Sequence, residues 1–260
     1  MIIKAIILGI IEGLTEFLPV SSTGHLIIAN RYLNFTGSFA NAFAVVIQVG
    51  AIFAVVLYFK DKVFPEFGNK RRMAEYIYLW TKVVVGVIPA VILGLLFDDY
   101  IEEHFFNPTT VAAALIFGAI LLLLGERGQK KARVISEKHI SYKQAFIVGI
   151  AQCMALWPGM SRSASTIIGG LFVGFSRKVA AEFSFFLAIP TLIGAAILKL
   201  FKMGLDFTSY EWLVLAVGTF VSFVVAYFVI AFFMNYIKKR KLSPFAYYRI
   251  ILGIIVLLAV

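Results

Sequence analysis

The sequence predicts an all-α integral membrane protein, and composition and patterning carry this prediction. Of its 260 residues, 61% are hydrophobic and only 15% are charged. The mean hydropathy of +0.93 means more apolar surface than a soluble chain of this length can bury. The apolar runs are continuous rather than alternating, which argues against an outer-membrane barrel. The net charge of +10 is explained by basic cytoplasmic loops, so no nucleic-acid partner is predicted.

Six apolar runs are each about long enough to cross a bilayer, some only with their flanks. They cover residues 41–59, 78–97, 109–125, 183–201, 213–234 and 245–260. Lysine and arginine gather in segments 60–82, 126–143 and 238–241, whereas 98–108 contains neither and is acidic. The positive-inside rule therefore predicts that the basic segments are cytoplasmic and that 98–108 lies outside.

Two further apolar stretches, 1–35 and 144–175, are interrupted by polar clusters that begin near Pro19 and Pro158. The second stretch lies between two basic segments, so it must enter and leave the membrane on one side. Irregular backbone at that depth is tolerated only inside protein or beside a cavity. We therefore expect two re-entrant helix-loop-helix elements in addition to six transmembrane helices, with both termini outside.

The sequence also indicates an internal duplication within a single membrane domain, 1–260. Gly-Ile-Ile-Glu at 9–12 matches Gly-Ile-Ala-Gln at 149–152, and each precedes a proline and a serine-rich break. Colinear matches 140 residues apart indicate repeat one at 1–125, a basic cytoplasmic linker at 126–143 and repeat two at 144–260. Each half holds three spans, an odd number, so the second half is expected to be inverted relative to the first.

Glu12 and Glu16 are the first candidate functional residues. They are four residues apart and share one helix face, and each charge costs roughly 2.5–3.5 kcal/mol or more within hydrocarbon. A divalent cation, Mg²⁺ or Ca²⁺, suits such a pair of carboxylates; an acid/base pair is the other functional interpretation. The structural alternative is one protonated glutamate that hydrogen-bonds a neighbouring helix.

The motif Ser21-Ser22-Thr23-Gly24-His25 follows Pro19, which ends the preceding helix. A serine can cap the next helix, whose free N–H groups and positive dipole end suit a phosphate. His25 falls in the first turn of that helix. The alternative is that these groups only satisfy buried backbone.

The corresponding segment of the second half, 158–166, predicts a second buried helix N-terminus, now with Arg162. An arginine at membrane depth needs an anionic partner, either a glutamate or a phosphate. Ser161, Ser163 and Thr166 add hydroxyl groups, and Gln152, which matches Glu12, is a candidate ligand or a helix bridge. The structural alternative for Arg162 is a salt bridge that joins the two halves.

Ser22 and His25 suggest nucleophilic chemistry because they lie three residues apart. A serine hydroxyl needs a base, and His25 can accept its proton and later return it. Ser22 is therefore the expected nucleophile and His25 the expected acid/base. Attack by His25 itself, with Ser22 as a phosphate ligand, or direct attack by water, remains open.

The motifs Glu-Gly-Leu-Thr-Glu-Phe-Leu-Pro-Val-Ser-Ser-Thr-Gly-His at 12–25 and Pro-Gly-Met-Ser-Arg-Ser at 158–163 resemble the two signatures of the undecaprenyl-diphosphatase, or bacitracin-resistance, family. The resemblance implies a multi-pass phosphatase of the bacterial inner membrane. It also implies metal-linked Glu12 and Glu16, catalytic Ser22 and His25, and phosphate-binding Arg162. The active site is expected to face outside and to take a polyprenyl diphosphate among membrane lipids.

A transporter or flippase for a phosphorylated lipid is the main alternative, because paired broken helices in inverted repeats are typical of transporters. A carrier needs binding groups but not a nucleophile beside an acid/base partner, which favours the enzyme. A non-catalytic membrane scaffold is disfavoured by the buried charges. The sequence leaves a homodimer open.

Overall fold

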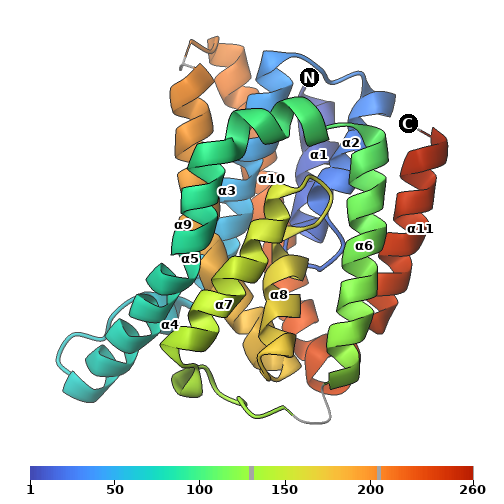
Figure 1. Ribbon diagram of the computed structural model, residues 1–260. Helices are drawn as coiled ribbons and strands as arrows, with labels where there is room; N and C mark the ends of the chain where they lie inside the picture. The colour runs from blue at the N-terminus through green and yellow to red at the C-terminus, as the bar shows by residue number, and fades with distance from the viewer. Residues whose placement is uncertain (129–131, 204–205, 260) are drawn as a thin grey trace.

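The computed structural model describes residues 1–128, 132–203 and 206–259, and within them the secondary structure is helical apart from turns and one isolated bridge. Figure 1 shows the helices as an upright bundle in which α1 begins and α11 ends at the same end of the molecule. The elements are α1 (Ile2–Thr15), α2 (Ser22–Leu33), α3 (Ser38–Tyr58), α4 (Lys60–Val63), α5 (Lys70–Phe105), α6 (Pro108–Arg127), η2 (Glu137–His139), α7 (Tyr142–Gln152), η3 (Cys153–Leu156), α8 (Arg162–Phe172), α9 (Arg177–Met203), α10 (Ser209–Lys239) and α11 (Ser243–Ala259).

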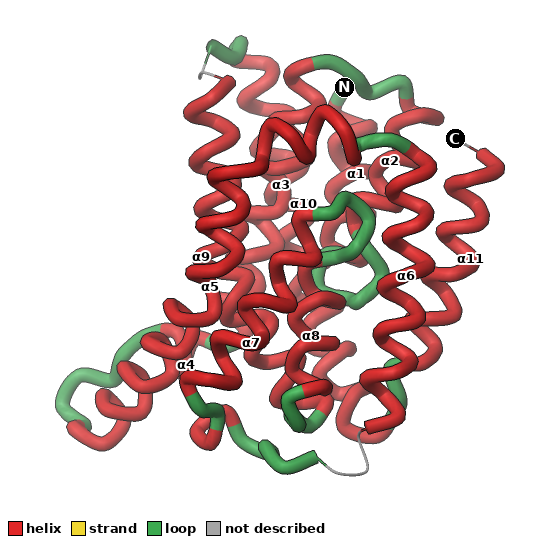
Figure 2. The backbone as a smooth tube through the Cα atoms, in the orientation of Figure 1, coloured by secondary structure: helices red, strands yellow, loops and turns green. Residues whose placement is uncertain are grey.

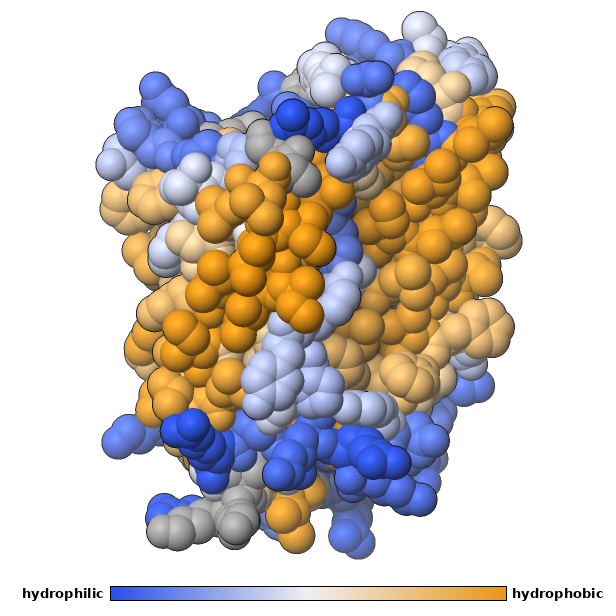
Figure 3. Space-filling model, turned by 90° about the vertical axis from the view of Figure 1, so that its right-hand side faces the viewer, coloured by the Kyte–Doolittle hydropathy of each residue, from blue (hydrophilic) through white to orange (hydrophobic). Residues whose placement is uncertain are grey.

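Five of these helices, α3, α5, α6, α9 and α10, are long and apolar enough to cross a membrane. The last apolar helix, at Ser243–Leu258, is shorter than that criterion. Figure 3 shows an apolar belt between two hydrophilic ends, crossed by a strip of hydrophilic side chains. The prediction of an all-helical integral membrane protein is therefore confirmed, and five of the six expected spans correspond to helices of sufficient length.

Helix α5 differs most from its predicted span of 78–97, since it extends over Lys70–Phe105. Asn69 caps its start through a hydrogen bond to the Arg72 N–H, and Pro108 opens the next helix. No strong helix breaker stands between these positions except Pro89, which the helix accommodates. Hydropathy locates the apolar part of a helix, whereas caps and breakers decide where the helix ends.

Two shorter helix pairs, α1–α2 and α7–α8, turn back inside the bundle. The loop between α1 and α2 and the loop before α8 both reach the middle of the molecule in Figures 1 and 2. The start of α8 contacts the first loop, because the Ser163 hydroxyl donates a 2.9 Å hydrogen bond to the Leu18 carbonyl. The polar clusters singled out in the two broken stretches thus come together in space.

The two loops share an unusual backbone feature at the residue that caps the following helix. Ser21 has φ 72° and Ser161 has φ 71°, a left-handed region that non-glycine residues rarely adopt. Gly159 also has positive φ, and a Cβ there would lie 2.5 Å from the Val111 carbonyl oxygen. These conformations end one helix and start the next within a few residues, deep in the bundle.

The linker end of the molecule lies opposite the chain termini. Residues 129–131 of the predicted linker 126–143 lie outside the described residues. Around the rest of the linker, Lys62 forms ion pairs with Glu137 and Glu182. Lys82 is fully buried and donates to the Glu137 and Lys138 carbonyls.

Candidate active site

Glu16 is the centre of the polar cluster formed by the two loops. It follows the last residue of α1, and one of its oxygens accepts a 2.8 Å hydrogen bond from the Ser22 hydroxyl. Its other oxygen accepts a 2.8 Å hydrogen bond from Arg162 Nη2. One carboxylate therefore joins the end of α1 to the starts of α2 and α8.

Glu12 lies one turn before Glu16 and is fully buried, with 0% exposure. Neither of its carboxylate oxygens has a hydrogen-bond partner among the described residues. Its electrostatic neighbours are Glu16 and Arg162. Buried carboxylates are normally paired or hydrogen-bonded, so the two unpartnered oxygens make Glu12 a candidate ligand-binding group.

Arg162 is the first residue of α8 and is held from two sides. In addition to Glu16, its guanidinium donates to the Ser184 carbonyl at 3.1 Å and to the Ser184 hydroxyl at 3.4 Å. Thr166 donates to the same Ser184 hydroxyl at 2.7 Å. The Arg162 Nε is buried without a hydrogen-bond partner among the described residues, so this arginine retains a free donor.

The serine caps of α2 and α8 have matching geometry. Ser21 Oγ accepts from the Gly24 N–H and Ser161 Oγ accepts from the Ala164 N–H, both at 3.3 Å. The first two N–H groups of each helix have no carbonyl partner within the helix. They belong to Ser22 and Thr23 in α2 and to Arg162 and Ser163 in α8. Two helix N-termini, both favourable for an anion, thus begin beside the Glu16–Arg162 pair.

His25 does not contact Ser22 through a hydrogen bond. Its Nδ1 lies 2.7 Å from the Ser21 carbonyl oxygen, and its Nε2 lies 2.7 Å from the Tyr248 hydroxyl. Because a carbonyl only accepts, Nδ1 carries the hydrogen, and Nε2 is the titrating nitrogen. The Ser22 hydroxyl instead donates to Glu16, so the expected transfer of the Ser22 proton to His25 stays a prediction without a contact to support it.

Gln152 ends α7 and is buried. Its amide nitrogen donates weakly to the Thr191 hydroxyl at 3.4 Å, and its amide oxygen has no partner among the described residues. This hydrogen bond joins α7 to Thr191 of α9 and agrees with the interpretation of Gln152 as a bridge between helices. A role of Gln152 as a ligand stays a prediction.

Sequence reasoning missed three residues that contact the cluster or its loops. Ser184 is a small polar residue within an apolar span, where helix packing is the ordinary interpretation, and Tyr248 carried no signal because an interfacial tyrosine is ordinary. Arg249 did carry one, since a lone arginine inside an apolar run demands a buried partner. Its guanidinium is buried and binds backbone carbonyls of both loops, at Pro19 and Gly159.

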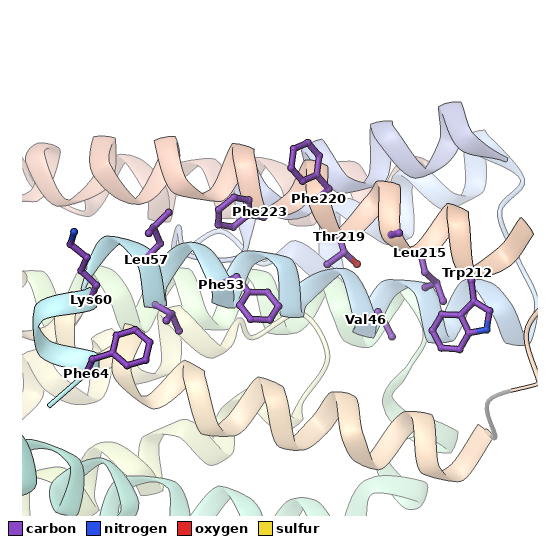
Figure 4. A pocket seen from close by; sticks show the side chains of 12 residues that line it. Val46, Phe53, Leu57, Lys60, Phe64, Trp212, Leu215, Thr219, Phe220 and Phe223 are labelled. Carbon is purple, nitrogen blue, oxygen red and sulfur yellow. The ribbon is translucent and has the colours of Figure 1, made fainter. Parts of the chain in front are cut away.

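An apolar groove of about 850 Å³ between α3 and α10 lies away from this chemistry. Figure 4 shows aromatic and aliphatic side chains along it, with Lys60 toward one end and Trp212 toward the other. None of the candidate site residues lines it. Its surface suits hydrocarbon, whereas the charged and hydroxyl side chains gather at the two loops.

The fold and the cluster define a class: an integral membrane protein with a buried site of carboxylates, hydroxyls and a guanidinium at two converging helix N-termini. Such a site suits a phosphorylated ligand. Residues 5–255 match the family described as bacitracin resistance protein BacA, and the chain belongs to this family. The family expected from the two motifs is therefore confirmed.

Curated relatives match the chain along nearly its whole length. Undecaprenyl-diphosphatase 1 of Clostridioides difficile is 51% identical over 260 residues, covering 98% of this chain and 95% of that protein. Undecaprenyl-diphosphatase of Thermoanaerobacter sp. (strain X514) is 49% identical over 261 residues, covering 100% and 97%. The protein of the same name from Enterococcus faecalis is 48% identical over 265 residues, covering 99% and 96%.

Proposed function

We propose that this chain is a membrane phosphatase that hydrolyses undecaprenyl diphosphate to undecaprenyl phosphate and inorganic phosphate, and so recycles a lipid carrier of cell-wall synthesis. One observation carries the chemistry. The cluster that contains Ser22 also holds a free guanidinium donor on Arg162 and two unpartnered oxygens on Glu12. A diphosphate with a bound cation complements both groups.

The terminal phosphate is proposed to bind between the N-termini of α2 and α8. Arg162 contributes its free Nε, and the N–H groups at the two helix starts, which lack intrahelical partners, are the further proposed donors. Ser21, Thr23 and Gly24 form the rim on the α2 side, and Ser161, Ser163 and Thr166 form it on the α8 side. Donors placed where negative charge develops lower the barrier to phosphoryl transfer.

Ser22 is proposed as the nucleophile. Its oxygen attacks the terminal phosphorus, the bond from that phosphorus to the bridging oxygen breaks, and undecaprenyl phosphate leaves with the bridging oxygen. Water then attacks the phosphoserine, breaks its phosphorus–oxygen bond and releases inorganic phosphate, which restores the hydroxyl. The net change is one water molecule consumed for each anhydride bond cleaved.

Two groups compete for the role of base toward Ser22. Glu16 already accepts the Ser22 hydrogen bond at 2.8 Å, so we favour Glu16 for the first proton. His25 is one turn along α2, with its Nε2 on the half-exposed Tyr248, and we propose that it serves proton exchange for the water step. The adduct distinguishes the alternatives: an acid-labile adduct indicates attack by His25, and the absence of any adduct indicates direct attack by water.

A divalent cation, Mg²⁺ or Ca²⁺, would be held chiefly by Glu12, with Glu16 as the second carboxylate, because both Glu16 oxygens already accept hydrogen bonds from Ser22 and Arg162. The unpartnered Glu12 oxygens support this, because hard cations prefer carboxylate oxygen. No third histidine, cysteine or acidic residue completes a metal-ligand group in the described part of the chain. That suits Mg²⁺, which is often held by one or two carboxylates together with substrate phosphates. When bound, the cation neutralises charge on the diphosphate.

An inverted repeat is the architecture we propose for the site, with halves at 1–125 and 144–260. Besides the matching serine caps, the helix contacts correspond across the halves. A Cβ at Gly9 of α1 would meet the Gly218 carbonyl of α10 at 2.6 Å, and one at Gly149 of α7 would meet the Gly86 carbonyl of α5 at 2.3 Å. Each re-entrant helix thus packs on a long helix of the other half.

The same proposal makes α11 the sixth membrane span and places the protein in the bacterial inner membrane. Both termini and the active site then lie on the outer side. The loop charges support this orientation through the positive-inside rule. A homodimer is part of the same proposal.

The test is phosphate release from undecaprenyl diphosphate by the purified protein in detergent. Wild-type protein is expected to release one phosphate per substrate, and the Ser22→Ala variant to lose nearly all turnover. A conservative change in the apolar groove, Phe53→Leu, is the control and should retain turnover. A wild-type protein that binds the lipid without releasing phosphate would refute the enzyme and favour the transporter or flippase.

A further inference from the structure

Arg249 of α11 is fully buried, with 0% exposure, and its hydrogen bonds within the described part of the chain go to backbone carbonyls. Its Nε donates to the Leu115 carbonyl at 3.2 Å and its Nη2 to the Ala114 carbonyl at 3.3 Å, both on α6. The same guanidinium reaches the Pro19 carbonyl at 3.5 Å and the Gly159 carbonyl at 3.3 Å. One side chain therefore connects α6 and both re-entrant loops.

The two loop contacts are equivalent positions. Pro19 stands two residues before Ser21, and Gly159 stands two residues before Ser161. Ser21 and Ser161 are the helix caps with positive φ. The guanidinium thus binds the equivalent carbonyl of each loop. Each carbonyl stands two residues before the serine that caps the helix beginning with Ser22 or Arg162.

The energetics argue against an incidental arginine. Its guanidinium makes no ion pair among the described residues, and burying an unpaired cation at membrane depth is costly. Loop carbonyls inside a bilayer have no helical N–H partner, and each needs a donor. A guanidinium offers five donors in a fixed fork, whereas a lysine offers a single nitrogen that cannot span all four carbonyls.

We propose that Arg249 is a positioning residue for the reaction: it holds the two loops in the register that places Ser22 beside Glu16 and Arg162. It acts through the loops rather than on the substrate. This inference rests on the proposed function, because its effect is measured on turnover.

The experiment compares Arg249→Lys with the wild-type protein in the phosphate-release assay, together with thermal unfolding in detergent. We expect kcat to fall on the order of a hundredfold, since misplacing a reacting group by about 1 Å costs that much. KM should change less than about threefold, because each loop keeps its own binding groups. A purely structural role would lower the amount of folded enzyme but leave kcat per folded molecule unchanged.

Lys82 supplies the matched control. It is also a fully buried cation that binds two carbonyls, those of Glu137 and Lys138, but at the linker end of the molecule. Lys82→Met should lower the unfolding temperature while kcat per folded molecule stays within about twofold of wild type. Arg249→Lys with near-normal kcat, or Lys82→Met with an equal loss of kcat, overturns the proposal.

Gly118→Ala decides the case if Arg249→Lys fails to fold. A Cβ at Gly118 would lie 2.2 Å from Arg249 Nη2 and 2.9 Å from its Cζ, so alanine displaces the guanidinium and keeps its charge. We expect reduced kcat with KM preserved; an unchanged kcat overturns the proposal. A wild-type protein without phosphatase activity would instead refute the proposed function, which separates the two failures.

Discussion

Replacing Arg162 with lysine tests the site sharply, because lysine keeps the positive charge and removes the guanidinium fork. Arg162 now uses Nη2 for Glu16 and Nη1 for Ser184, with Nε free for a phosphate oxygen. A single ammonium nitrogen can maintain the Glu16 pair but cannot also reproduce the other two contacts. Loss of a transition-state donor costs about 10²–10³ in kcat, or about 2.7–4 kcal/mol.

The assay is steady-state phosphate release, with thermal unfolding measured on the same preparations. Arg177→Lys is the matched control, because Arg177 also pairs with a buried glutamate, Glu126, through a 2.8 Å contact from its Nε. The control should keep kcat within about twofold. An Arg162→Lys enzyme with kcat within about threefold of wild type would refute the phosphate clamp and favour a structural ion pair.

Four further outcomes follow from the site and the fold. Glu12→Gln should lower turnover by about two orders of magnitude or more and abolish metal dependence, whereas full wild-type activity in excess chelator would leave the carboxylates as an acid/base pair. A quenched reaction with substrate labelled at the terminal phosphorus should give an acid-stable adduct on Ser22; an acid-labile adduct would implicate histidine. In cells whose native cysteine has been replaced, an impermeant thiol reagent should label a cysteine at Glu103 and not one at Lys239, and the reverse pattern would overturn the topology. Burial opposes ionisation of Glu137, but the hydrogen bond from a lysine of α4 outweighs burial and lowers the Glu137 pKa. The ionised Glu137 therefore stabilises the fold above the unfolded-state pKa, and this stabilisation is lost as the pH falls through the folded-state pKa. Thermal unfolding at acid pH should show a larger loss of stability for the wild type than for Glu137→Gln.

Much of the fold was predictable from local patterns. Long apolar runs identify membrane helices because backbone and side chains must both be satisfied in hydrocarbon. The prolines and serines at 19–22 and 158–161 predict helix breaks, which lie where the structure has its two inner loops. The pairing of Arg162 with a glutamate follows from the cost of a lone charge, although the sequence left open whether the partner was Glu12, Glu16 or a phosphate.

The residue spacing by itself determined that Glu12 and Glu16 share a face and that Ser22 and His25 lie in one helical turn. It did not determine which partner each side chain meets, because that depends on elements distant in the chain. His25 is held by Tyr248 of α11, 223 residues away, and Ser22 meets Glu16 across the loop. Arg249 reaches both loops only because α11 packs on α6. Helical periodicity fixes directions within one helix, whereas hydrogen-bond partners across helices are decided when buried polar groups in the packed bundle must find donors and acceptors.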